Sequence, residues 1–392
     1  MKILIANPGS TSYKFKLLDT DSGENLFQAI AERIGDAKGI FSHDWGNKNG
    51  TGEEMHIPDY YSAVNLAIEA LKQKISLSDI RAVGFKVVLA KGVTGCVGLD
   101  EDVLEAMVEY LPLAPVHNSV YLSAISVFQK LLPGIPLVGL FETSFHKDIP
   151  AQAFLYGIPY GYYKKYGIRK YGFHGASHRY ISEYARDRYG KANNELKIIS
   201  CHLGGSSSIC AIKNGISIDT SMGMSPQCGL LNMKRVGDLD SFALLYIMER
   251  EGLSIDDMRQ ILISKGGVYG ISELSGDLRD IDKAMKEGNI QAGLAFKSFA
   301  YAAKRYIGEY MAILNRADII VLTGGIGQNS SSMRREILSD MENIGIILDR
   351  IRNESDLKEG LISTDDSPVR IAVAPTDEEA VVARAVREYL ED

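Results

Sequence analysis

The sequence predicts an α/β fold built from two domains. The chain has 392 residues, which is long for a single hydrophobic core. Apolar, strand-like runs alternate with helix-like segments along the chain, a pattern typical of an α/β protein. Residues 3–17 and 198–212 each run from an apolar strand into a loop of small residues and back into a strand. Two such hairpins, about half a chain apart, predict a duplicated fold.

The first half contains the elements expected of one domain. Residues 60–74 place apolar side chains three and four positions apart and predict an amphipathic helix. Further expected elements are strands over 82–89 and 136–141 and helices over 100–109 and 118–131. After Pro150 the composition shifts toward tyrosine and glycine, so we place the first domain at residues 1–148.

The second half repeats this order. Its expected elements are a strand pair over 197–213, helices over 238–251, 255–264, 290–315 and 333–341, strands over 318–322 and 369–374, and a final helix over 377–390. Residues 323–330 predict a glycine-rich loop, which either binds an anionic or ribose-bearing ligand or is a tight turn. We place the second domain at residues 149–378 and expect the helix at 379–392 to complete the first domain.

The composition argues against several classes of protein. Hydrophobic residues make up 45% and charged residues 24% of the chain, as in soluble globular proteins. The formal net charge of −7 argues against nucleic-acid binding and gives no reason to expect a membrane surface. The four cysteines form no CxxC pair, the chain opens directly on a strand, and no apolar run is long enough for a membrane span. We therefore expect a cytoplasmic protein with reduced cysteines.

The tips of the two hairpins suit phosphate oxygens. Their small residues leave backbone N–H groups and hydroxyls accessible, with no bulky side chain in the way. Ordinary turns use the same residue types. However, the pairing of two copies, with Lys14 just past the first tip and His202 just before the second, favours a grip on one polyphosphate from two sides. The hairpins therefore predict an ATP-dependent phosphotransferase.

Other positions carry side chains suited to phosphoryl transfer. His174 lies between glycines, where its ring can donate to developing negative charge, whereas His178 fits a histidine satisfied in the core. Arg235 can neutralise a phosphoryl group in flight, or form a surface ion pair with Asp238. Glu142 follows an apolar strand, where active-site carboxylates often stand.

Glu378 and Glu379 lie at the start of the last expected helix. Acidic residues at such a position complement the helix dipole. Alternatively, they hold Mg²⁺, which prefers a few carboxylates together with water and phosphate oxygens.

Seven blocks of residues, taken in order, resemble acetate kinases. They are NPGSTSYK at 7–14, YGIRKYGFHG at 166–175, HLG at 202–204, DTSMG at 219–223, RVGD at 235–238, SGDLRD at 275–280 and GIGQN at 325–329. The resemblance covers nearly the whole chain. It implies the sugar kinase, Hsp70 and actin superfamily, whose ribonuclease H-like (actin-like ATPase) domains are duplicated and have a βββαβαβα core. It also implies ATP-dependent phosphorylation of a small carboxylate to an acyl phosphate by direct in-line transfer.

The resemblance also implies roles for individual residues. Asn7 and Glu378 would hold Mg²⁺ or Mn²⁺, and Glu142, His174 and Arg235 would be catalytic. The carboxylate would be bound by Lys86, Val88, Val116, Phe173 and Pro226. ATP or ADP would be bound by Ser10, Ser12, Lys14, His202, Leu203, Gly204, Gly205, Ser206, Asp277, Leu278, Arg279, Gly325, Ile326, Gly327, Gln328 and Asn329. As in the family, we expect a homodimer formed through the C-terminal domain.

The chain departs from the family pattern mainly at the acyl site. Lys86 stands where the family has an arginine, Glu142 where it has an aspartate, Gly205 where it has an asparagine, and Lys91 adds a cation. A lysine gives a point charge where an arginine gives a bidentate fork, so we expect acetate to be used poorly or not at all. In one alternative, Lys86 and Glu142 compensate as a re-spaced pair and acetate still binds. In another, the protein is a catalytically altered paralogue with a sensing or scaffolding role.

Overall fold

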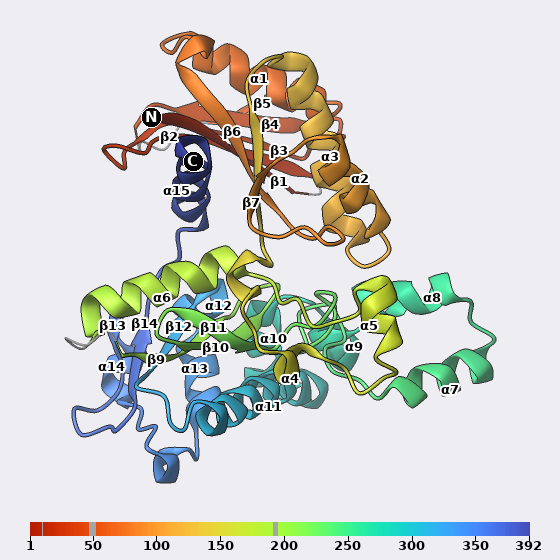
Figure 1. The fold of residues 1–392 in the computed structure, drawn as a ribbon. Helices are drawn as coiled ribbons and strands as arrows, with labels where there is room; N and C mark the ends of the chain where they lie inside the picture. The colour runs from red at the N-terminus through yellow and green to blue at the C-terminus, as the bar shows by residue number, and fades with distance from the viewer. Residues whose placement is uncertain (10, 47–51, 191–194) are drawn as a thin grey trace. The chain divides into compact units, whose positions relative to one another are not determined.

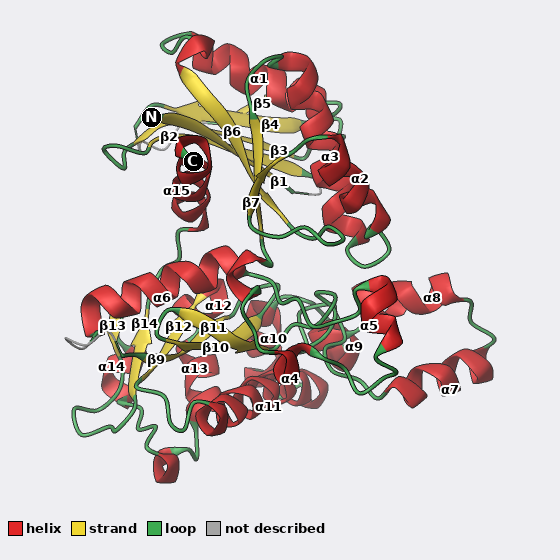
Figure 2. Cartoon of the chain, viewed as in Figure 1, coloured by secondary structure: helices red, strands yellow, loops and turns green. Residues whose placement is uncertain are grey.

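The computed structural model describes residues 1–9, 11–46, 52–190 and 195–392, without the side chain of Val116. The chain divides into two compact units (Figure 1). Met1–Lys147 and Asp377–Asp392 form the first unit, and Asp148–Thr376 form the second. Each unit has one mixed β-sheet with helices packed on it (Figure 2). The α/β class predicted from the sequence is confirmed.

The first unit contains an eight-stranded sheet in the order β5-β4-β3-β2-β1-β6-β8-β7. Its strands are β1 (Lys2–Pro8), β2 (Ser12–Asp19), β3 (Asn25–Glu32), β4 (Gly39–Asp44), β5 (Glu53–Met55), β6 (Ile80–Val87), β7 (Cys96–Gly98) and β8 (Leu137–Phe141). Its helices are α1 (Tyr60–Lys72), α2 (Glu101–Glu109), α3 (Pro115–Leu131) and α15 (Glu378–Glu391). Buried aromatic rings join the sheet to α3: Phe85 and Phe128 meet edge to face with centroids 5.4 Å apart.

The second unit contains a six-stranded sheet in the order β11-β10-β9-β12-β14-β13. Its strands are β9 (Lys197–His202), β10 (Ser208–Lys213), β11 (Ile216–Thr220), β12 (Ile319–Thr323), β13 (Gly360–Leu361) and β14 (Arg370–Val373). Its helices are α4 (Ala151–Phe154), α5 (Gly161–Tyr166), α6 (Gly175–Tyr189), α7 (Ser241–Glu251), α8 (Ile255–Gln260), α9 (Gly267–Ser272), α10 (Leu278–Lys286), α11 (Ile290–Ile313), α12 (Gly324–Asn329), α13 (Ser331–Leu338) and α14 (Arg350–Glu354). Among the described helices, none combines the length and the apolar character that a membrane crossing requires.

The two sheets share one topology, as the paired hairpins predicted. In the first, β1 pairs antiparallel with β2 and β2 with β3, while β6 and β8 continue parallel to β1. In the second, β9, β10 and β11 form the antiparallel part, and β12 and β14 continue parallel to β9. The helix that follows the last parallel strand is exchanged between the units. α6 comes after β8 in the chain but packs on β9, and α15 comes after β14 but packs on β1 and β6.

One predicted element differs in kind from the structure. The segment expected as a glycine-rich loop at 323–330 contains the short helix α12, which follows β12 directly. Glycine has low intrinsic helix propensity, but tertiary hydrogen bonds override it here. The N–H groups of Ile326 and Gly327 donate to the carbonyl of Leu203 over 2.9 and 3.2 Å. The sequence carries no local sign of these bonds, because Leu203 lies on the distant β9–β10 hairpin.

Candidate active site

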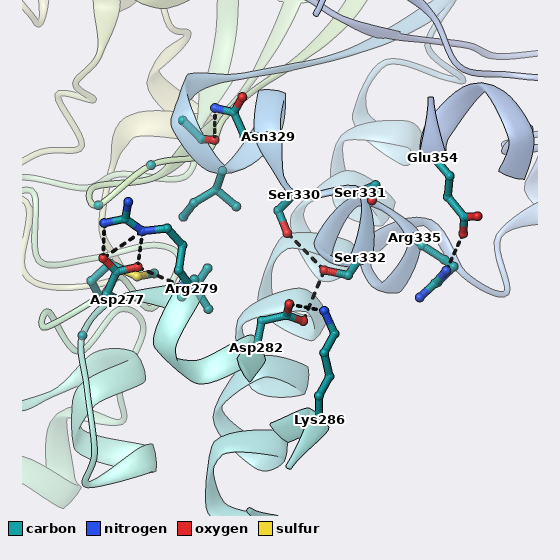
Figure 3. Close-up of a pocket in the computed structure, with 17 residues that line it drawn as sticks. Asp277, Arg279, Asp282, Lys286, Asn329, Ser330, Ser331, Ser332, Arg335 and Glu354 are labelled. Atoms are coloured by element: carbon teal, nitrogen blue, oxygen red, sulfur yellow. Dashed lines mark hydrogen bonds and ion pairs between the residues drawn. The ribbon is translucent and has the colours of Figure 1, made fainter. Parts of the chain in front are cut away.

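A cavity of about 940 Å³ in the second unit gathers the segments assigned to the nucleotide (Figure 3). Gly204 and Gly205 line it from the β9–β10 hairpin, 277–279 from the start of α10, and Gly325, Ile326 and Asn329 from α12. These segments are far apart in the sequence, and the fold brings them around one space. A cavity of this volume accommodates a nucleotide-sized ligand.

The hairpin tip at this cavity is held in shape by polar groups. The Ser207 hydroxyl donates to the Gly204 carbonyl over 3.0 Å and accepts from the Gly204 N–H over 3.1 Å. The Ser207 N–H donates to Oδ1 of the buried Asn232 over 2.6 Å. A Cβ atom at Gly205 would have nothing within 4 Å, so the tip faces open space. A fixed, uncovered tip is what a phosphate-binding loop requires.

The hairpin and α12 are joined through Leu203. This residue is fully buried, its N–H donates to the Thr323 carbonyl over 2.9 Å, and its carbonyl accepts from α12. Gly324 has a φ of +77°, and a Cβ atom there would stand 2.6 Å from the Leu203 oxygen. Only glycine fits so close an approach with that backbone conformation. Leu203 therefore serves the cavity by fixing its walls.

The cavity also has lining residues for which the sequence predicted no individual role. They are Met233, Gly276, Asp282, Lys286, Ser330, Ser331, Ser332, Arg335 and Glu354. Figure 3 shows Lys286 paired with Asp282, and Arg335 paired with Glu354, over 2.5 and 2.6 Å. Arg279 pairs in turn with Asp277, and hydrogen bonds from Arg279 lower the pKa of that carboxyl. Of these residues, only the three serines that directly follow the GIGQN block could have been suggested by a local sequence pattern.

Three histidines meet beside the hairpin. His174 precedes α6 with a φ of 56°, and its ring stacks on that of His202 with centroids 4.3 Å apart. His174 Nδ1 lies 2.8 Å from Ser208 Oγ. His178 is fully buried, with Nδ1 2.8 Å from Ser200 Oγ and Nε2 2.8 Å from Ser208 Oγ. His178 is therefore a buried histidine whose two ring nitrogens both have hydrogen-bond partners in the core, as the sequence suggested. His174 is only partly buried.

Arg235 does not form the alternative ion pair with Asp238. Its Nη1 donates to the Pro226 carbonyl over 3.1 Å, and it has no carboxylate partner among the described residues. Asp238 instead accepts from the Gly229 N–H over 2.8 Å and from the Tyr306 hydroxyl over 2.6 Å. Burial lowers the pKa of Arg235. A partly buried guanidinium without a carboxylate is suited to receive an anion.

The candidate residues of the first unit gather where its parallel strands end. Asn7 is near the end of β1, Lys86 is on β6, Glu142 directly follows β8, and Glu378 begins α15. The Lys86 ammonium lies 3.2 Å from Glu142 Oε1 and forms a closer ion pair with Glu378 Oε2. The Tyr121 hydroxyl donates to Asn7 Oδ1 over 3.5 Å. The carboxyl ends of parallel strands are a usual place for an active site.

The charge of Lys86 is held by its neighbours. Burial acts to lower the pKa of Lys86, but the charges of Glu378 and Glu142 outweigh it and raise that pKa well above its ordinary value. Lys91, the second lysine that differs from the family pattern, forms an ion pair with Glu109. Both lysines of the predicted acyl site are therefore already paired with carboxylates within the first unit.

The oxygen atoms of this cluster are of the chemical type that a magnesium ion binds. Mg²⁺ takes oxygen ligands and retains water and phosphate oxygens, so it needs few protein groups. The Asn7 amide and the carboxylates of Glu142 and Glu378 supply such oxygens. Among the described residues, no three or more His, Cys, Asp or Glu side chains are arranged so that they could hold a metal ion. This cluster has two carboxylates and one amide, so other ligands would have to complete the coordination.

The other predicted site residues are spread over both units. Lys14 is exposed on β2, in register with Asn7 on β1, and the Ser12 carbonyl accepts from the Gly9 N–H over 2.8 Å. Val88, Phe173 and Pro226 are buried. Ser206 lies at the β9–β10 tip and Gln328 on α12. Ser10 and the side chain of Val116 lie outside the described part of the chain.

Comparison with known proteins places the chain in a family. Residues 2–384 match the model of the acetokinase family. The chain is 43% identical to the acetate kinase of Thermoanaerobacter pseudethanolicus, with 98% of each chain covered. It is also 43% identical to the acetate kinase of Thermotoga maritima, covering 100% of this chain and 99% of the relative.

Solved structures give the same result. A Porphyromonas gingivalis acetate kinase matches with a TM-score of 0.88 and 38% identity, covering 99% of both chains. A Francisella tularensis propionate kinase matches with a TM-score of 0.91 and 31% identity, covering 98% of both chains. The shared sheet topology, the cavity built from the nucleotide motifs and these full-length matches lead to one conclusion: the chain belongs to the acetokinase family.

Proposed function

We propose that this protein transfers the γ-phosphoryl group of ATP to a small carboxylate, giving an acyl phosphate and ADP by direct in-line transfer. Relatives named acetate kinase and propionate kinase support this reaction class. The observation that carries the proposal is the cavity of the second unit, where the β9–β10 tip, α10 and α12 surround one space. The family membership and this cavity together favour a kinase over any other use of the fold.

The second unit binds the nucleotide and stabilises the group in transfer. The tip at Gly204 and Gly205 receives phosphate oxygens on its backbone, while α10 and α12 form the walls around the rest of the nucleotide. The Arg235 guanidinium and the His174 ring offset the charge that develops on the phosphoryl oxygens. Phosphoryl transfer needs little covalent help, so positioning and charge stabilisation make up most of the catalysis.

The first unit binds the acceptor and the metal. Asn7 and Glu378 would hold Mg²⁺ or Mn²⁺, which would supply positive charge to neutralise the phosphate oxygens. Glu142 orients the acceptor side of the site. Lys86 balances the charge of Glu142 and Glu378, and Val88 contributes an apolar wall for the acyl group.

Direct trapping of the product tests this function. The protein is incubated with ATP, Mg²⁺ and a panel of acetate, propionate, butyrate, branched, hydroxy and dicarboxylic acids, and acyl phosphate is trapped with hydroxylamine. We expect carboxylate-dependent acyl hydroxamate together with an equal amount of ADP. Tight ADP binding without product across the whole panel would instead support a sensing or scaffolding protein.

We also propose that the chain acts as a cytoplasmic homodimer formed through its second unit. Helices α7 and α11 of that unit carry large apolar side chains that are exposed in the single chain. Phe242 is 76% exposed on α7, and Ile290 is 88% exposed at the start of α11. Exposed apolar surface of this kind favours burial against a second copy.

A further inference from the structure

A continuous line of hydrogen bonds runs from the core of the second unit to His174. It begins at Ser200 on β9, passes through both ring nitrogens of His178 on α6, crosses the Ser208 hydroxyl on β10, and ends at His174 Nδ1. All three distances are 2.8 Å. Ser200, His178 and Ser208 are each 0% exposed, so bulk water does not compete for these bonds.

The number of protons available limits the directions in which the hydrogen bonds of this line can be donated. The Ser208 hydroxyl has one proton, so it donates to only one of the two imidazole nitrogens that it contacts. The other nitrogen must carry a proton and donate to Ser208. Ser200 contacts a single ring nitrogen, His178 Nδ1, so its hydroxyl donates to that nitrogen or accepts from it according to the tautomer of His178. In the neutral state each histidine carries one ring proton, so the whole line points in one direction or in the other.

The role of His174 selects the direction, and this step rests on the function proposed above. A neutral His174 that donates to a phosphoryl oxygen must carry its proton on Nε2, which leaves Nδ1 as an acceptor. Ser208 then donates to His174, His178 donates from Nε2 to Ser208, and Ser200 donates to His178 Nδ1. In this direction every hydroxyl and ring proton along the line is used.

The backbone does not hold the His174 ring by itself. His174 occupies the position before α6 with a left-handed φ of 56° and makes no side-chain capping bond to the helix. The ring is instead placed by its stacking on His202 and by the Ser208 hydroxyl. The Ser208 hydroxyl contacts a ring nitrogen directly, so it can influence where the ring carries its proton.

We propose that Ser208, His178 and Ser200 are positioning residues that hold His174 as the Nε2–H tautomer and orient it for phosphoryl transfer. His178 thus acts as the middle member of the line in addition to being satisfied in the core. The three residues do not touch the reacting atoms. They act through His174 alone.

Nuclear magnetic resonance of the histidine rings tests the tautomer directly. The ligand-free protein is labelled with ¹⁵N-histidine, and its seven histidines are assigned by single substitutions. Long-range ¹H–¹⁵N couplings then report which nitrogen of each ring carries the proton. We expect His174 and His178 both to carry it on Nε2. A proton on His174 Nδ1 at neutral pH would overturn the proposal.

Substitutions test whether the line sets that state. Ser208→Ala should abolish the tautomer preference of His174 and lower kcat on the order of tenfold, the effect of losing about one hydrogen bond, with little change in KM for ATP. Ser200→Ala should weaken the preference in the same direction, although its hydroxyl bonds to His178 instead of His174. Ser208→Thr restores the hydroxyl and should recover the Nε2–H signal.

A matched control separates the line from general loss of packing. The Ser177 hydroxyl makes a bond of the same 2.8 Å length to His202 Nδ1. Ser177→Ala should therefore leave the His174 tautomer unchanged. If Ser208→Ala or Ser200→Ala folds and the His174 tautomer stays as in the wild type, the proposal fails. An unchanged kcat in His174→Ala would remove His174 from the reaction instead, while the tautomer measurement would still decide whether the line exists.

Discussion

Arg235→Ala offers the sharpest test of the proposed chemistry. The guanidinium is partly buried, bonds to the Pro226 carbonyl and has no carboxylate partner among the described residues. Its pKa is lowered by burial, so the fold holds a charge there that it does not itself compensate. A unit charge about 4 Å from a phosphoryl oxygen contributes about 4 kcal/mol at the effective dielectric constant of a partly buried site. Each 1.36 kcal/mol corresponds to tenfold in rate, so we expect kcat to fall about 10³-fold.

Steady-state kinetics with a coupled ADP assay measure this loss. KM for ATP should change little, because the interaction develops mainly in the transition state. Arg235→Lys should recover only part of kcat, since an ammonium lacks the planar fork.

Arg279→Ala is the matched comparison for Arg235→Ala. Arg279 lines the nucleotide cavity, its side chain is 90% exposed, and its charge is already paired with Asp277. Its removal should therefore act mainly on KM for ATP. A kcat for Arg235→Ala within a few-fold of the wild type, in a protein with unchanged Tm, would refute the role given to Arg235.

Three further outcomes follow from the structure. Lys86→Arg should raise kcat/KM for acetate about tenfold, because a guanidinium can contact Glu142 and still offer a second N–H pair to the acceptor; an unchanged or lower kcat/KM for acetate in a folded variant would contradict this. Gly324→Ala should lower the free energy of unfolding by about 1–3 kcal/mol, measured by urea denaturation, because its φ of +77° strains any side chain; an unchanged midpoint would show that the β12–α12 turn adapts. Phe242→Asp on α7 should convert a dimer into a 43.0 kDa monomer in sedimentation; a wild type that sediments only as a monomer at micromolar concentration would rule the dimer out.

Local sequence patterns account for most of the framework. Both hairpins, and the parallel strands that follow them, could be predicted because buried strands read as short apolar runs. The α12 segment could not, since its helix depends on the Leu203 carbonyl more than a hundred positions away. The periodicity of α6 and α15 does not show their exchange between the units, because an amphipathic helix does not specify which sheet it covers. Of the two, only the last helix was expected with the other domain, as the completion of the first one.

The site residues show the same difference between what local sequence specifies and what depends on distant parts of the chain. A motif identifies a residue by its immediate neighbours, so the glycines of the β9–β10 tip and the histidine before α6 could be predicted as candidates. The partners of a charge come from anywhere in the chain. Lys86 and Glu378 are 292 positions apart, and Arg235 bonds to the Pro226 carbonyl in place of the nearby Asp238.

The pairing of Lys86 changes how its substitution should be understood. Taken alone, a lysine in place of an arginine suggests a weaker hold on the substrate carboxylate. The structure adds that the ammonium lies against Glu142 and Glu378, so its charge is already committed inside the protein. An acceptor carboxylate would have to compete with two internal carboxylates for one cation, and an ammonium lacks the planar fork that would bind it through two parallel N–H bonds. The choice among acceptor acids should therefore depend more on contacts to the acyl group than on contacts to the carboxylate. The panel of acids proposed above tests this, because its members differ in the acyl group as well as in charge.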